Sequence, residues 1–213
     1  MSEFRAEAYF IKQDDLFNTI SSNDKHKLDY LLTKSEELCI DIKEGFTVEL
    51  PLKEQVKSLL NGSYQEKGFK NFYGFWILVH GIATSRPKVS GIPYPFLILD
   101  EIVEELEESN YTEVKKLLGT LCGVHTGSYS FPYSYSSEWR QPYIAMIDPA
   151  KSELLIEEIA SINEKMKNYS WEALLDQDDW AVSLEEEDLH TIFDWIIEGR
   201  NVNKTLVIIV DGS

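Results

Sequence analysis

The chain has 213 residues, 37 of them acidic and 20 basic, which gives a formal net charge of −17. Its length and its 43% hydrophobic content are those of a globular protein that folds without a metal or disulfide framework, which excludes a disordered or fibrous chain. The acidic excess argues against direct binding to nucleic acid or to anionic membranes, because both carry negative charge themselves.

The excess negative charge lies in the second half of the chain. Residues 1–99 contain 13 acids and 12 bases, a net charge of −1, whereas residues 100–213 contain 24 acids and 8 bases, a net charge of −16. No repeat or low-complexity linker separates the two halves. We therefore expect residues 1–213 to form a single globular domain whose C-terminal half is strongly acidic.

The sequence predicts a soluble, cytoplasmic protein. The N-terminus has no apolar segment typical of a signal peptide, and no run approaches the roughly 18 apolar residues of a membrane-spanning helix. The two cysteines, Cys39 and Cys122, are far apart in the sequence. This spacing suits buried thiols in a reducing compartment better than a disulfide framework, and a bridge between the two stays open as an alternative.

The first fifty residues predict a strand, two helices and a second strand. Residues 4–10 alternate apolar and polar side chains, which is typical of a half-buried strand. Asp14 begins a short helix, and Asn23 or Asp24 suits the N-cap of the next one. Alternation over residues 46–50 predicts the second strand.

Residues 51–95 predict two further helices and a loop. Pro51 suits the first turn of a helix that ends at Asn61-Gly62. The run 72–83 is apolar nearly all round, so we expect it to be a central buried helix. Residues 84–95 contain three prolines and are expected to form a loop.

The acidic half begins with two predicted helices, 97–108 and 112–121, whose apolar residues repeat at helical spacing. Residues 123–142 lose all periodicity, which predicts a long loop. Beyond this loop we expect a strand over 143–147 and a long helix over 148–167.

The end of the chain predicts a helix followed by a strand. The apolar side of the preceding helix consists of Leu154, Leu155, Ile159, Ile162 and Met166. Ser183 and Glu186 form a capping box for the last helix, and Gly199 is expected to end it. Residues 206–210 are continuously apolar, which indicates a strand inside a sheet. The chain therefore predicts an α+β fold: a small mixed β-sheet of about four strands, including both chain ends, covered by about eight helices.

This layout resembles that of the YfbM-like and related uncharacterised bacterial families. The resemblance rests on the opening strand and capped helices at 6–15, on the aromatic helix start Phe72-Tyr73-Gly74-Phe75, and on the closing helix and apolar strand at 193–196 and 206–210. It implies an α+β fold in a bacterial protein and supplies no functional residues.

No motif in the sequence predicts catalysis, a metal or a cofactor. Cys122 and His125 are close enough in sequence to form a nucleophile and its base, but no carboxylate that would orient the base can be named. The sequence therefore favours a binding protein over an enzyme. None of the four histidines has the spacing that a helical metal site requires: His26, His80, His125 and His190.

Two acidic clusters are the strongest candidates for a binding surface. The acids at 185–188 begin a helix and complement its dipole, but two other clusters have no such local explanation. We predict that the protein binds a basic protein partner, as an immunity protein or antitoxin does, and that electrostatic steering speeds the association. The predicted partner-binding residues are Asp100, Glu101, Glu104, Glu105, Glu108, Asp176, Asp178 and Asp179.

The aromatic loop over 123–142 has two interpretations. Its side chains either hold a long loop on the core or line a pocket for a small molecule, the pocket of an enzyme or binding protein. A third alternative for the protein as a whole is an acidic mimic of nucleic acid. The candidate pocket residues are His125, Tyr129, Tyr133, Tyr135, Trp139 and Arg140.

Overall fold

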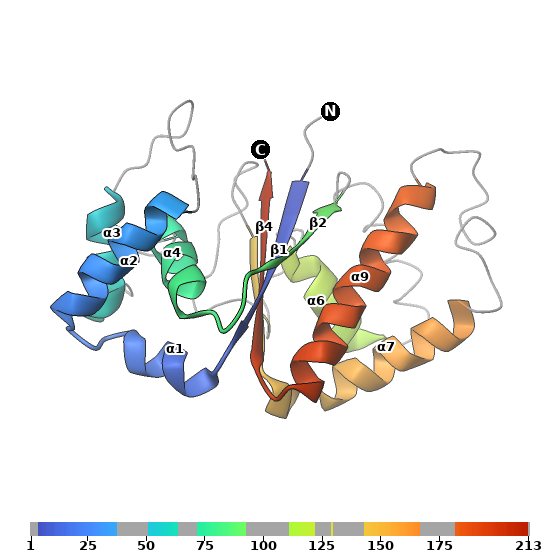
Figure 1. Ribbon diagram of the computed structural model, residues 1–213. Coiled ribbons are helices and arrows are strands. Elements are labelled where there is room, and N and C mark those ends of the chain that lie inside the picture. The colour runs from blue at the N-terminus through green and yellow to red at the C-terminus, as the bar shows by residue number, and fades with distance from the viewer. Residues whose placement is uncertain are drawn as a thin grey trace. The chain divides into compact units, whose positions relative to one another are not determined.

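The computed structural model has the α+β fold that the sequence predicts (Figure 1). It describes residues 4–37, 51–63, 72–92, 111–121, 129, 143–166 and 182–212. In these ranges it has seven α-helices. The elements are β1 (Phe4–Ile11), α1 (Gln13–Thr19), α2 (Lys25–Glu37), α3 (Leu52–Leu60), α4 (Phe72–Ile82), β2 (Lys88–Ile92), α6 (Thr112–Leu121), β3 (Tyr143–Ile147), η3 (Pro149–Lys151, a 3₁₀ turn), α7 (Glu153–Met166), α9 (Val182–Asn201) and β4 (Thr205–Gly212).

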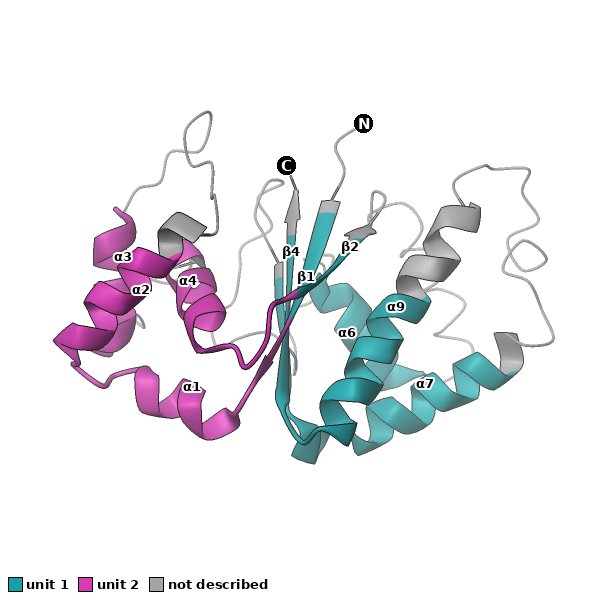
Figure 2. Cartoon of the chain, in the orientation of Figure 1, with its two compact units in different colours: residues 1–8, 88–131, 137–213 teal, residues 9–87, 132–136 magenta. Residues whose placement is uncertain are grey.

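The contacts divide the chain into two compact units (Figure 2). Unit 1 consists of residues 1–8, 88–131 and 137–213, and unit 2 of residues 9–87 and 132–136. Ala8 and Lys88 are direct partners across strands β1 and β2. The chain therefore leaves unit 1 after Ala8 and re-enters it at the neighbouring position on the next strand.

Unit 1 contains a four-stranded sheet in the order β2-β1-β4-β3, antiparallel rather than mixed. Strand β4 is interior, and Val207, Ile208 and Ile209 are fully buried although they alternate between its two faces. This confirms the prediction of an interior strand at 206–210. Helix α9 contacts β2 and β4, and α6 contacts β3 and β4, so that α6, α7 and α9 form a layer beside the sheet (Figure 1).

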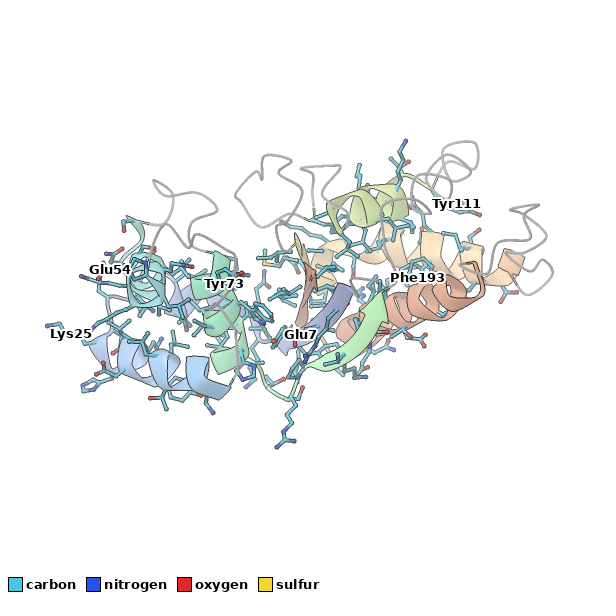
Figure 3. The ribbon with its side chains drawn as sticks, turned by 90° about the horizontal axis from the view of Figure 1, so that it is seen from above. Glu7, Lys25, Glu54, Tyr73, Tyr111 and Phe193 are labelled. Carbon is cyan, nitrogen blue, oxygen red and sulfur yellow. The ribbon has the colours of Figure 1, made fainter. Side chains whose placement is uncertain are left out.

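Strand β1 is more buried than its alternating sequence predicts. Ala6 to Ile11 are all almost completely buried, including Glu7 (Figure 3), and the last three of these residues, 9–11, belong to unit 2. The Glu7 carboxylate is 2.7 Å from the guanidinium of Arg5, two residues earlier on the same face of the strand. A buried carboxylate needs such a partner to offset its desolvation.

Strand β2 corrects the prediction of a loop over 84–95. It pairs with β1 from Lys88 to Ile92 and lies at the edge of the sheet. An edge strand tolerates Gly91 and the flanking Pro87, because one side of its backbone needs no partner in the sheet. Pro87 and Gly91 are typical of a turn, so the sequence predicts a loop where pairing with β1 forms a strand.

Unit 2 is built around α4, which packs against α1, α2 and α3. Phe75 to Val79 are buried, which confirms the predicted central helix. The Gln55 side chain of α3 accepts a hydrogen bond at 3.0 Å from the backbone N–H of Gly74. It thereby satisfies one of the N–H groups that the first turn of α4 leaves without a helical partner.

The sequence located several helix ends in unit 2 correctly. Asp24 caps α2, because its carboxylate accepts hydrogen bonds from the backbone N–H groups of His26 at 2.9 Å and Lys27 at 3.3 Å. Helix α3 starts directly after Pro51 and ends before the predicted stop, where Gly62 has a φ of +78°. Only glycine adopts this left-handed conformation readily.

Helix α9 does not end at Gly199, as the sequence predicts, but continues to Asn201. The N–H of Lys204 donates to the carbonyl of Gly199 at 3.0 Å, and the N–H of Asn203 donates to that of Arg200 at 3.1 Å. Asn203 itself has a φ of +52°. This is a Schellman motif in which asparagine takes the left-handed position that glycine usually occupies, so Gly199 stays inside the helix.

Two predicted elements lie outside the described residues, the strand over 46–50 and the helix over 97–108. The two cysteines, Cys39 and Cys122, also lie outside them.

Candidate interaction surface on unit 1

The charge imbalance of the sequence follows the two units. Unit 1 contains 26 acids and 10 bases, a net charge of −16, whereas unit 2 contains 11 acids and 10 bases, a net charge of −1. Unit 1 also includes residues 1–8 and 88–99 from the first half of the chain, and these carry two acids and two bases. Their charges cancel, so the two units differ in net charge by the same amount as the two halves of the sequence. One compact unit therefore carries nearly all of the excess charge.

Part of this charge is neutralised within unit 1. The Glu113 carboxylate lies 2.6 Å from the Lys116 ammonium, one helical turn further along α6. Glu198 of α9 pairs with Lys88 of β2. Both pairs are partly exposed, and such pairs contribute about 1 kcal/mol or less to stability.

The outer face of α7 carries three exposed acids, Glu153, Glu157 and Glu164. At 100° per residue they lie within about 40° of one another around the helix, and along the helix they span about 16 Å. Glu153 and Glu157 form no ion pair with a described residue. Because acids four residues apart repel each other, this stripe slightly destabilises the isolated helix.

An exposed leucine lies beside this acidic stripe. The sequence places Leu154 on the apolar side of its helix, but the side chain is 53% exposed. Leu155, Ile159 and Ile162, which the sequence assigns to the same side, are buried as predicted. At 100° per residue Leu154 lies about 100° from Leu155 around the helix, at the margin of the buried face.

The inner face of α7 is tied to the start of α6. The Glu158 carboxylate accepts hydrogen bonds from the backbone N–H groups of Glu113 at 2.8 Å and Val114 at 2.9 Å. Tyr111, directly before α6 (Figure 3), has its hydroxyl 3.0 Å from that of Ser161 on α7. A carboxylate at a helix N-terminus satisfies free N–H groups and complements the helix dipole. These contacts therefore hold α7 in position with its acidic face outward.

Tyr129 is the one candidate pocket residue that the structure describes, and it is buried. Its hydroxyl donates a hydrogen bond to the Glu113 carboxylate at 2.8 Å. Its backbone carbonyl accepts one from the N–H of Met146 on the edge strand β3 at 2.7 Å. At this residue the geometry is that of an aromatic side chain that holds its segment on the core.

The ionisation of this pair is perturbed in opposite directions. Burial raises the pKa of Tyr129 well above the ordinary value of 10.0, and the hydrogen bond to Glu113 and the nearby charges of Glu113 and Glu158 add to the effect. Burial also acts to raise the pKa of Glu113. Hydrogen bonds from Lys116 and Tyr129 and the ammonium charge of Lys116 outweigh it, so that this pKa is lowered.

We expect Tyr129→Phe to lower the free energy of unfolding by about 1.5 kcal/mol near pH 7, because it removes a buried hydrogen bond to a charged group. Folding raises the pKa of Tyr129 above its ordinary value of 10.0. The hydroxyl therefore makes its full contribution to the free energy of unfolding below pH 10, and this contribution falls as the pH rises above 10 because the unfolded chain loses the proton first. Urea unfolding of both proteins between pH 7 and pH 11 measures this difference. A gap that stays constant up to pH 11 would contradict the assignment.

The other candidate residues of the sequence lie outside the described residues. This holds for the eight predicted partner-binding acids and for the remaining five candidate pocket residues, His125, Tyr133, Tyr135, Trp139 and Arg140.

The described part of the chain contains neither a metal-binding cluster nor a membrane-spanning helix. No group of three or more acidic, histidine or cysteine side chains there is arranged to hold a metal ion. No helix among these residues is both long and apolar enough to cross a membrane.

The α7 stripe is not among the acidic clusters that the sequence predicts as a binding surface, although its spacing is visible in the sequence. Glu153, Glu157 and Glu164 are separated by four and seven residues, which is the spacing of one helical face. The stripe is not a run of consecutive acids, so it is recognised only when the acids of the predicted helix over 148–167 are sorted by face.

Comparisons with known proteins do not supply a family. No family model matches the chain, and neither a curated protein nor a solved structure shows significant similarity to it.

Proposed function

We propose that the protein binds a basic protein partner through the acidic surface of unit 1, in the manner of an immunity protein or antitoxin. The observation that carries this proposal is the separation of charge, with −16 on unit 1 (26 acids, 10 bases) and −1 on unit 2 (11 acids, 10 bases). If acidity served solubility alone, the excess would have no reason to avoid one unit.

The exposed acids of unit 1 support the proposal. Glu153 on α7 and Asp194 on α9 are exposed and have no ion-pair partner among the described residues. Concentrated charge of one sign raises the rate of association with an oppositely charged partner and suppresses binding to partners of the same sign. It also makes the complex sensitive to salt.

The test begins with isolation of the partner. The tagged protein is mixed at low salt with a lysate of the organism that encodes it, and the proteins that salt elutes are identified. The most enriched one is then purified, and its affinity for the chain is measured between 50 mM and 500 mM salt. We expect a basic protein whose affinity falls as salt rises.

Two matched double variants then locate the binding surface. Glu153→Lys with Asp194→Lys changes a first-turn acid and a mid-helix acid in unit 1, and Asp15→Lys with Asp29→Lys makes the same changes in unit 2. All four residues are exposed. We expect the unit 1 variant to bind at least about tenfold more weakly, about 1.4 kcal/mol, and the unit 2 variant to bind like the original. Equal effects of both variants would refute a surface on unit 1.

A further inference from the structure

At the start of α7 an exposed leucine is flanked in the sequence by a basic residue on one side and an acidic residue on the other. Leu154 is 53% exposed. Three residues before it is Lys151, the last residue of η3, and three residues after it is Glu157. Both side chains are exposed, and neither forms an ion pair with a described residue. In the sequence, an exposed apolar side chain thus lies midway between two opposite charges that have no ion-pair partner in the described part of the chain.

We infer that the surface around Leu154 is a self-association site whose occupant is a second copy of this chain. A two-fold axis near Leu154 lays the first turns of two α7 helices antiparallel. The residue three before Leu154 in one copy then lies level with the residue three after it in the other. Each Lys151 therefore faces Glu157 of the second copy, and the two leucines meet at the axis.

The end of α9 adds apolar surface at the same end of unit 1. The guanidinium of Arg200 donates a hydrogen bond at 2.7 Å to the carbonyl of Pro149 in η3, which brings the last turn of α9 against this turn (Figure 1). Val202, two residues further along, is 46% exposed. Two of the large exposed apolar side chains thus lie on segments that meet at this end of unit 1.

The net charge of −17 opposes the approach of two copies. At physiological ionic strength, however, charges separated by more than about 8 Å are largely screened, whereas those in contact are not. The local complementarity around Leu154 therefore decides whether the contact forms. Because the contact surface around Leu154 is small, we expect a weak dimer with a dissociation constant on the order of 100 µM.

The test is sedimentation equilibrium of the full chain in about 150 mM salt, with circular dichroism to verify the fold of each variant. Leu154→Asp places two carboxylates at the axis and should raise the dissociation constant at least about tenfold. Phe17→Asp is the matched control, since Phe17 is 60% exposed on α1 and belongs to unit 2. It should leave the dissociation constant unchanged.

A charge swap tests the pairing itself. Lys151→Glu alone and Glu157→Lys alone each create two contacts between like charges, and each should weaken the dimer about fivefold or more. The double variant restores both pairs with their signs exchanged and should return the dissociation constant to within about twofold of the original. A monomer at every accessible concentration, or a double variant as weak as the single ones, would overturn the inference.

The self-association and the proposed function fail separately. Leu154→Asp keeps Glu153, Glu157 and Asp194, so it should weaken self-association while partner binding is retained, and Asp194→Lys on α9 changes an acid that is not part of the dimer contact. Loss of one property in its own variants therefore leaves the other to be measured independently.

Discussion

Replacing Glu158 by alanine will lower the free energy of unfolding by about 3 kcal/mol. The side chain is only 8% exposed, and one of its oxygens accepts both backbone hydrogen bonds at the start of α6. Alanine leaves the N–H groups of Glu113 and Val114 without these partners, and that of Val114 is buried. Hydrogen bonds to a charged group contribute about 1.5–3 kcal/mol each, and buried donors left without a partner are costly in addition.

The neighbouring residue is the control for this measurement. Glu157 belongs to the same helix and has the same side chain, but it is exposed and has no ion-pair partner among the described residues. Glu157→Ala should change stability by no more than about 0.5 kcal/mol, since it removes only a repulsion with Glu153. Urea unfolding followed by circular dichroism measures both variants. Equal losses for the two residues would show that Glu158 does not cap α6.

Gly74→Ala will also cost about 3 kcal/mol, because α4 and α3 approach each other too closely for a side chain at this position. A β-carbon at Gly74 would lie 2.8 Å from the backbone carbonyl carbon of Gln55 and 2.9 Å from the backbone nitrogen of Val56. Backbone atoms in a packed helix cannot rotate away. The two helices must separate, and the hydrogen bond from Gly74 to Gln55 is strained as they do.

Gly81 on the same helix provides the comparison. A β-carbon there would lie 2.4 Å from the Cδ2 atom of Leu31, which is the end of a side chain and can move. The higher helix propensity of alanine, about 1 kcal/mol, offsets part of the cost. Gly81→Ala should therefore be clearly less destabilising than Gly74→Ala in thermal and urea unfolding. The reverse order would contradict the close approach of α3 and α4.

The sequence predicts best those elements whose residues carry their own signals. Helix α6 has the predicted bounds of 112–121, and strand β3 has the predicted bounds of 143–147. Asp24 caps α2, and Pro51 precedes α3, as their side-chain chemistry predicts. Each of these signals acts over a few residues of chain and needs no partner from elsewhere in the fold.

The prediction fails where a distant partner decides the outcome. Residues 88–92 have proline and glycine in and around them, yet they form a strand because β1 supplies the hydrogen bonds. Competing local signals also mislead: Gly199 is typical of a helix end, but Asn203, four residues later, takes the left-handed position of the Schellman motif. Leu154 fits the apolar pattern of its helix and is nevertheless exposed.

The candidate site divides in the same way. The uneven charge follows from counting residues in the sequence. Residues 1–99 contain 13 acids and 12 bases, a net charge of −1, and residues 100–213 contain 24 acids and 8 bases, a net charge of −16. That this charge belongs to one compact unit follows only from the fold, because Ala8 pairs with Lys88 and the residues between them form a separate unit. Which acids of α7 are exposed likewise follows only from the packing of this helix against α6.

The sequence by itself determined the α+β class, the local helix ends and the uneven charge. These properties depend on composition, periodicity and capping chemistry, which act between residues that are neighbours in the chain. The tertiary structure decided which carboxylates are used inside the fold and which remain for a partner. Glu157 and Glu158 are adjacent and chemically identical, but the burial of one against α6 and the exposure of the other depend on packing between distant segments.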